Sequence, residues 1–169
     1  MLAGEVEKQN SYIVIFCCLI QKFSIEQERR QIVTINMNLI IVGASPEGVS
    51  LAELALKDGH NVAIIEASEE RALAVLQEYN IKVFHANITQ GGILDEAGAD
   101  QADAIIATTS DDSANLMTMF LGKERNIPTL ISMVHEKEHR GLFTKIGVHV
   151  IVDPEVIIAH HLYNLLPQA

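Results

Sequence analysis

From Met37 onward, short β-branched runs alternate with stretches of helical periodicity, and this alternation constrains the fold more than any other feature of the chain. The expected strands are apolar on both faces, which is typical of a parallel sheet covered by helices on each side. Right-handed crossovers between such strands favour the order 3-2-1-4-5-6. The six expected strands cover residues 38–43, 61–66, 81–86, 103–108, 129–134 and 148–153.

Helical periodicity fills the intervals between these strands. The expected helices cover residues 46–58, 68–79, 90–97, 111–125, 136–146 and 154–166. Pro46 and Pro154 stand where a first helical turn tolerates a missing N–H, and Gly59, Gly98 and Gly147 follow helices. We therefore predict an α/β, doubly wound, Rossmann-like parallel sheet of about six strands.

Residues 1–36 differ from the rest and are expected to form an N-terminal extension to a domain of residues 37–169. The apolar run at 12–20 is about half of the roughly 20 residues that a membrane-spanning helix needs, so we expect no membrane span. Acidic residues ahead of this run disfavour a secretory signal. Three interpretations stay open: an extra element packed on the domain, sequence upstream of a natural start at Met37, or a tail that docks on a membrane or a partner.

Charge and cysteine content limit the partners and the compartment. The formal net charge of -10 repels a phosphate polymer, so nucleic acid is not an expected partner. The only cysteines, Cys17 and Cys18, are sequence neighbours and cannot close an ordinary disulfide loop. A reducing, cytoplasmic location follows as the expectation.

The stretch I-V-G-A-S-P-E-G, residues 41–48, joins the first expected strand to the first expected helix. Gly43 and Gly48 match the outer glycines of the G-x-G-x-x-G turn that binds dinucleotides, but Ser45 replaces the middle one. N–H groups at a helix start bind phosphate, although Pro46 supplies none. The Ser45 hydroxyl either donates to a phosphate oxygen or pushes the phosphate outward. A tight turn that serves packing alone is the other interpretation.

The second expected strand ends in Glu66, close to the interval of about 20 residues after the glycine turn at which a carboxylate accepts hydrogen bonds from ribose. A solvated strand end is the alternative interpretation. The carboxylate would repel a 2′-phosphate, so NADP is disfavoured as a ligand.

The chain from Met37 to about Leu166 resembles the RCK/KTN (TrkA-N-like) family, the nucleotide-binding regulatory domains of potassium transport systems. Four segments carry the resemblance, at residues 41–48, 64–71, 86–98 and 107–116. Their order and spacing are together more specific than any one of them. In this family the last segment, with its T-x-D-D-x-x-N pattern, faces the nucleotide.

The resemblance implies the residues that contact the nucleotide. Glu66 takes the ribose role, and Asn87 stands where the family has an aspartate near the adenosine end. The implied binding residues are Gly43, Ala44, Ser45, Pro46, Glu47, Gly48, Glu66, Ala67, Arg71, Asn87, Ile88, Thr108, Thr109, Ser110, Asp111 and Asn115.

The function that the resemblance implies is non-catalytic sensing of NAD(H) or an adenine nucleotide (AMP, ADP or ATP), coupled to a conformational change of a dimer. The implied partners are a second copy, in a homodimer or higher ring, and a membrane potassium transporter or channel. Two other functions stay open. The first is an interaction module that has lost its ligand, which Ser45 and Asn87 would fit. The second is an NAD-dependent oxidoreductase, which would share the fold; against it, no stretch of the sequence is left to form a substrate domain.

Two expected helices carry more apolar residues than one buried stripe needs. Residues 155–166 are apolar around most of the helix. The helix at 111–125 shows the same excess through Leu116, Met117, Met119, Phe120 and Leu121. The family places the last helix across a partner subunit, and the excess agrees with a subunit interface. Burial of both helices within their own fold is the alternative.

Residues 135–139 spell H-E-K-E-H, a literal H-E-x-x-H zinc motif. The motif directly follows an expected strand instead of lying in the middle of a helix. Leu142 and Lys145 stand where the extended form of the motif needs glycine and histidine. We therefore expect no metal site, and no nucleophile–base pair predicts a catalytic residue.

Overall fold

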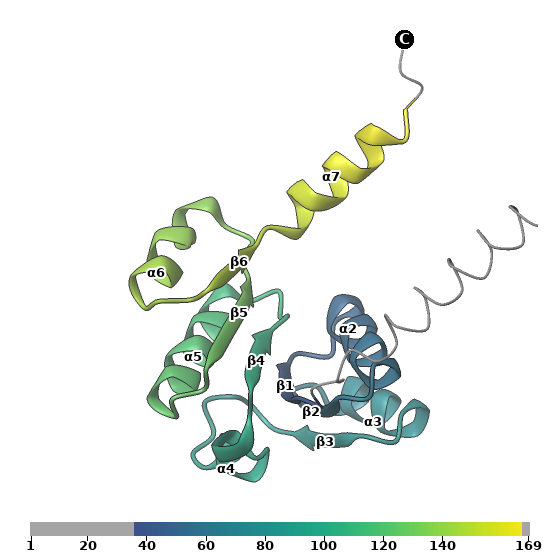
Figure 1. Cartoon of the computed structure of the whole chain (residues 1–169), viewed down its shortest axis with the longest axis vertical. Coiled ribbons are helices and arrows are strands. Elements are labelled where there is room, and N and C mark those ends of the chain that lie inside the picture. The colour runs from purple at the N-terminus through teal and green to yellow at the C-terminus, as the bar shows by residue number, and fades with distance from the viewer. Residues whose placement is uncertain (1–35, 167–169) are drawn as a thin grey trace, which may run out of the picture. The chain divides into compact units, whose positions relative to one another are not determined.

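The computed structural model describes residues 36–166 and contains a six-stranded parallel sheet. The strands have the order β3-β2-β1-β4-β5-β6, so the predicted fold class and strand order are confirmed (Figure 1). Their bounds are β1 Asn38–Val42, β2 Asn61–Glu66, β3 Lys82–His85, β4 Ala104–Ala107, β5 Thr129–Met133 and β6 Val150–Val152. The predictions for residues 1–35, including the apolar run, lie outside the described residues.

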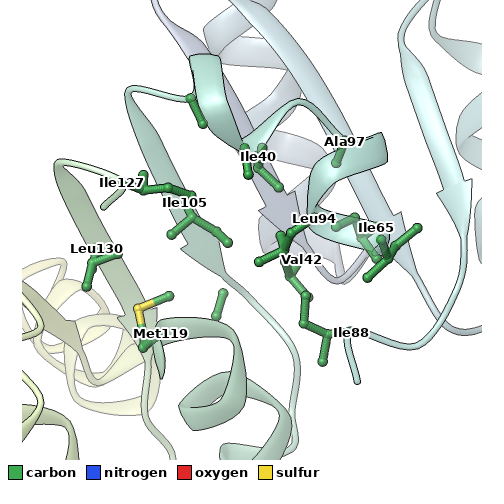
Figure 2. Close-up of a cluster of buried hydrophobic side chains, with 14 of the residues drawn as sticks. Ile40, Val42, Ile65, Ile88, Leu94, Ala97, Ile105, Met119, Ile127 and Leu130 are labelled. Carbon is green, nitrogen blue, oxygen red and sulfur yellow. The ribbon is translucent and has the colours of Figure 1, made fainter. Parts of the chain in front are cut away.

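Alternate strand residues feed two cores, one on each face of the sheet. Leu39, Ile41 and Ile64 belong to a cluster with Ala52, Ala55 and Val75 of helices α2 (Pro46–Lys57) and α3 (Glu69–Glu78). Ile40, Val42, Ile65 and Ile105 belong to a second cluster on the opposite face (Figure 2). Complete burial of an isoleucine side chain stabilises the fold by about 1.5–3 kcal/mol, so the central strands provide much of the driving force.

The second core is covered by the helices of the later half of the chain. These are α4 (Ile93–Glu96), α5 (Asp112–Glu124) and α6 (Arg140–Lys145). They contribute Leu94, Met119 and Phe143, of which the last two are fully buried. Figure 1 shows α2 and α3 on one side of the sheet and these three helices on the other.

Side-chain caps begin the longer helices. Ser45, Ser68, Asp111 and Asp153 each accept a hydrogen bond from a backbone N–H of the first turn that has no partner within the helix. Asp153 is the N-cap of helix α7 (Pro154–Asn164).

Two expected helices are shorter than the periodicity predicted. The interval 90–97 contains only the single turn α4, because Gly92 at its N-cap has a φ of 86° and cannot continue a right-handed helix. The interval 136–146 divides into a 3-10 turn, Lys137–His139, followed by α6. Here the Asp112 carboxylate accepts hydrogen bonds from the N–H groups of His135 and Glu136, which holds the chain extended before the turn.

Helix α7 leads away from the end of β6 (Figure 1) and leaves its apolar side chains exposed. The exposed residues are Val156, Ile157, Ile158, Leu162 and Tyr163. Burial of this helix within its own fold, the alternative raised by its sequence, is therefore wrong for the described part of the chain. None of the helices in residues 36–166 is both long and apolar enough to cross a membrane.

Candidate functional site

A cavity of about 560 Å³ opens where β1, β2, β3, β4 and β5 end. Its volume lies in the range of sites that hold small molecules and cofactors. Carboxyl ends of parallel strands meet at one edge of a sheet, so residues from distant parts of the chain gather there. The predicted binding residues that line the cavity are Gly43, Ser45, Pro46, Glu47, Glu66, Ala67, Arg71, Asn87, Ile88, Thr108, Thr109, Ser110 and Asp111.

Three of the predicted residues support the cavity without lining it. The N–H of Ala44 donates to Glu66, that of Gly48 donates to Ser45, and Asn115 is completely buried behind Thr109. Sequence reasoning did not include the other lining residues, which are Val42, Ile65, Ala86, Ala114, Met133, His135, Pro154, Glu155 and Ile158.

Gly43 and Gly48 of the loop are each required to be glycine, for different steric reasons. Gly43 has a φ of 105°, which a side chain would strain, and it makes the sharp turn after β1. A Cβ atom on Gly48 would collide with the carbonyl oxygen of Gly43 and lie 2.5 Å from Thr108 Oγ1. That hydroxyl donates to the Gly43 carbonyl oxygen at 2.8 Å, so the loop, helix α2 and the end of β4 are in direct contact.

Ser45 at the middle glycine position is the N-cap of α2. Its backbone is extended, with φ −67° and ψ 165°, and therefore needs no glycine. Its Oγ accepts a hydrogen bond from Gly48 N at 3.2 Å. The hydroxyl hydrogen remains available to an acceptor in the cavity, because a hydroxyl both accepts and donates. Ser45 therefore caps helix α2 with its side chain, which a glycine at this position could not do.

The start of helix α2 brings two backbone donors to the cavity wall. Within residues 36–166, no acceptor takes the N–H groups of Ser45 and Glu47, and both residues line the cavity. Unpaired N–H groups and the dipole at the start of a 12-residue helix favour an anion. Pro46 between them supplies no N–H, as the sequence indicated.

Glu66 is 3% exposed and holds three donors. Its Oε2 accepts from Ala44 N at 2.6 Å, and its Oε1 accepts from Ser68 N at 2.7 Å and Arg71 Nη2 at 2.8 Å. Burial alone would raise the pKa of Glu66, but these hydrogen bonds and the Arg71 charge outweigh it and lower the pKa. A carboxylate offers about four acceptor positions, so one position on Oε2 remains for a ligand.

Asn115 fixes the loop that follows β4. Its Oδ1 accepts from the hydroxyl of Thr109 at 2.7 Å, and its Nδ2 donates to the carbonyl oxygens of Thr109 and Met133. A single buried amide therefore joins the ends of β4 and β5 and sets the wall of the cavity on that side.

His135 connects this wall to α7. Its Nδ1 lies 2.7 Å from Glu155 Oε1 and its Nε2 lies 3.3 Å from the carbonyl oxygen of Thr109. Both neighbours are acceptors, so the imidazolium form, with two N–H groups, satisfies both contacts. Burial lowers the pKa of His135, but the Glu155 carboxylate and the other acceptors more than compensate, and the pKa is raised.

The H-E-x-x-H motif is divided between two carboxylates. His135 faces Glu155, whereas His139 Nδ1 lies 2.9 Å from Asp112 Oδ2. The described residues contain no group of three or more His, Cys, Asp or Glu side chains that could hold a metal ion. Burial would raise the pKa of Asp112, but hydrogen bonds from the N–H groups of His135 and Glu136 and from His139 lower it. These histidines therefore act as hydrogen-bonding links between loops.

The cavity thus combines an anion site at a helix start with an ionised carboxylate at the next strand end. Sequence and structure comparisons identify proteins that are similar to this chain. A Trk system potassium uptake protein TrkA homolog from Methanothermobacter thermautotrophicus is 34% identical over 130 residues, which cover 77% of this chain and 60% of that relative. The chain therefore spans about three fifths of the length of this curated relative.

Solved structures share the fold at low identity. The TrkA-N domain of the inner membrane protein ybaL from Escherichia coli has a TM-score of 0.70 at 21% identity, covering 80% of this chain and all of that one. The GsuK channel bound to NAD has a TM-score of 0.67 at 20% identity, covering 89% and 29%. The Kef CTD of Shewanella denitrificans in AMP bound form has a TM-score of 0.65 at 20% identity, covering 78% and 82%.

The family assignment comes from the sequence match. Residues 39–154 match the TrkA-N domain, and this range extends from β1 through β6 to the first residue of α7. It therefore includes every strand of the sheet and nearly all of the cavity wall. The chain belongs to the TrkA-N domain family.

Proposed function

We propose that this chain is a non-catalytic, nucleotide-sensing regulatory domain of a potassium uptake or transport system. The observation that carries the proposal is the meeting of unpaired N–H groups at the start of α2 with the ionised carboxylate of Glu66 in one cavity. Two kinds of support come from known proteins: the Trk potassium uptake relative, and the structural neighbours bound to NAD and AMP.

The proposed ligand is NAD(H) or an adenine nucleotide. Its phosphate lies against the N–H groups of Ser45 and Glu47 and the Ser45 hydroxyl, where a helix start favours an anion. Its ribose donates a hydroxyl hydrogen to the free acceptor position of Glu66. The loop 108–111 covers the phosphates or a second nucleoside. NADP is disfavoured because a 2′-phosphate would lie against the Glu66 carboxylate.

The proposed output is a change in the geometry of a homodimer or higher ring. The exposed apolar surface of α7 supports a subunit contact, because monomeric proteins rarely expose large continuous apolar patches. A nucleotide that binds one dimer geometry better than another shifts the population toward it, and a cytoplasmic domain attached to a membrane transporter or channel would transmit that shift.

Equilibrium dialysis of the full chain against NADH, ATP, ADP and AMP tests the ligand. We expect saturable binding of at least one nucleotide, weakened by about 1 to 3 kcal/mol in Glu66→Ala, the cost of removing a hydrogen bond to a charged group. Glu69→Ala, in the exposed first turn of α3, is the matched control. Binding of none of these nucleotides would instead leave an interaction module that has lost its ligand.

A further inference from the structure

The order of the strand ends determines where the base of a bound nucleotide lies. This inference rests on the proposed function, which puts the phosphate at the start of α2, after β1, and the ribose at Glu66, after β2. The next strand outward is β3, and Ala86 N, just beyond its end, donates to the Glu66 carbonyl oxygen at 3.0 Å. A base that points away from the phosphate therefore reaches Asn87, which lines the cavity.

The amide of Asn87 has one possible orientation. Its Oδ1 accepts hydrogen bonds from Thr89 N at 2.9 Å and from Thr89 Oγ1 at 2.8 Å. A backbone N–H can only donate, so the atom that faces it is the oxygen and not the nitrogen. These two hydrogen bonds use both lone pairs of the oxygen.

The Nδ2 group is the remaining polar group of this side chain. No acceptor among residues 36–166 takes its hydrogens. Asn87 is exposed at the cavity wall, so this amino group is free to meet a ligand. The side chain therefore presents donors, and no free acceptor, to the base.

Purines differ in what they offer to such a donor. Adenine presents the N7 acceptor beside the N6 amino group, which is itself a donor, whereas a 6-oxopurine presents two adjacent acceptors, N7 and O6. The usual bidentate pairing of asparagine with adenine needs a free amide oxygen to accept from N6. In this protein that oxygen is already occupied by Thr89.

We propose that Asn87 is a specificity-determining residue that opens the base end of the cavity to 6-oxopurine nucleotides, those of hypoxanthine and guanine, alongside adenine nucleotides. The two hydrogens of Nδ2 pair with N7 and O6 of the oxopurine, while adenine satisfies one of them and leaves its amino group without a protein partner. An aspartate at this position would reverse the preference, because its free oxygen accepts from N6 of adenine.

Calorimetric titration of the full chain with AMP and IMP tests the proposal, because these two ligands differ at the purine 6-position. We expect wild type to bind IMP at least as tightly as AMP. Asn87→Asp, a change of nearly the same shape at an exposed position, is expected to favour AMP by tenfold or more, the size of a good bidentate discrimination.

Thr89→Val supplies an independent test in a residue that does not line the cavity. It removes one of the two donors from Asn87 Oδ1, so the freed lone pair is expected to raise the affinity for AMP relative to IMP by a few-fold. Thermal unfolding curves show that both variants are folded before titration.

Two outcomes would overturn the proposal while the proposed function stands: a tenfold preference of wild type for AMP, or an AMP-to-IMP affinity ratio that is the same in wild type and Asn87→Asp. If wild type binds no nucleotide at all, neither AMP, IMP nor the dialysis set, then both this proposal and the proposed function are overturned.

Discussion

Glu66→Gln perturbs the residue on which both the cavity and the local structure depend. The substitution keeps the shape of the side chain and exchanges one carboxylate oxygen for an NH₂ group. In the wild type, both oxygens of Glu66 accept, one from Ala44 N and the other from Ser68 N and Arg71 Nη2. Either orientation of the amide therefore points its NH₂ group at a backbone N–H.

The expected loss of stability follows from these contacts. A hydrogen bond to a charged group contributes about 1.5–3 kcal/mol, and Glu66→Gln loses at least one of them. For a chain of this size, 1 kcal/mol shifts Tm by about 2–4 °C, so we expect Tm to fall by about 3–12 °C. Glu69→Gln is the control, because Glu69 is exposed in the first turn of α3 and its loss is expected to change Tm by only a degree or two.

Thermal unfolding followed by circular dichroism measures this difference across pH. Hydrogen bonds lower the pKa of Glu66 in spite of its burial, so its contribution is present above the unfolded value of about 4.3 and is lost as pH falls through the folded value. The Tm difference between wild type and Glu66→Gln is therefore complete at pH 7 and narrows as pH falls below about 4.3. A Tm within 1 °C of wild type at pH 7 would refute the reasoning.

Three further predictions concern the loop and the cavity wall. Gly48→Ala is expected to destabilise the fold by about 1–3 kcal/mol in chemical denaturation, because the new methyl group would collide with the carbonyl oxygen of Gly43. Gly141→Ala is the control and is expected to be neutral or stabilising, because its methyl group would meet nothing within 4 Å. Ser45→Ala removes the cap of α2 and is expected to cost about 1 kcal/mol in the same assay; an unchanged midpoint would contradict the capping role. Glu155→Gln is expected to lower Tm more at pH 6 than at pH 9. The pKa of His135 is raised, so the His135–Glu155 pair stabilises the fold below the unfolded pKa of about 6.5, and this contribution is lost as pH rises through the folded pKa. This pair is partly exposed and screened by solvent, so the effect on Tm is expected to be small. An equal Tm difference at both pH values would exclude a charged His135.

The strands and the glycine loop could be predicted from the sequence because their causes are local. β-branched runs buried on both faces produce parallel strands. Gly43 is required by its backbone angle, and Gly48 by the close approach of the Gly43 carbonyl oxygen within the same loop. The shorter helices could not be predicted in the same way. Their limits depend on a left-handed Gly92 and on the Asp112 carboxylate, which holds a distant backbone segment.

Nine of the 22 residues that line the cavity were missed by sequence reasoning, for a different reason. His135 was considered only as part of a metal motif. It lies just after the end of β5, as Glu66 lies at the end of β2, so the rule that ligands bind at the carboxyl ends of parallel strands could have identified it. Glu155 and Ile158 carry no such signal. They reach the cavity only because β6 brings the start of α7 to its rim, which depends on the complete sheet.

The double position of α7 has a consequence for regulation. Ile158 forms part of the cavity wall, and on the same helix Ile157 and Leu162 are exposed and apolar. A protein surface that packs on Ile157 would therefore lie beside the cavity wall at Ile158. If the two events are coupled, linkage requires that ligand binding in the cavity and protein binding on α7 change each other's binding free energy by the same amount. The affinity for the ligand would then depend on whether a protein is bound to α7.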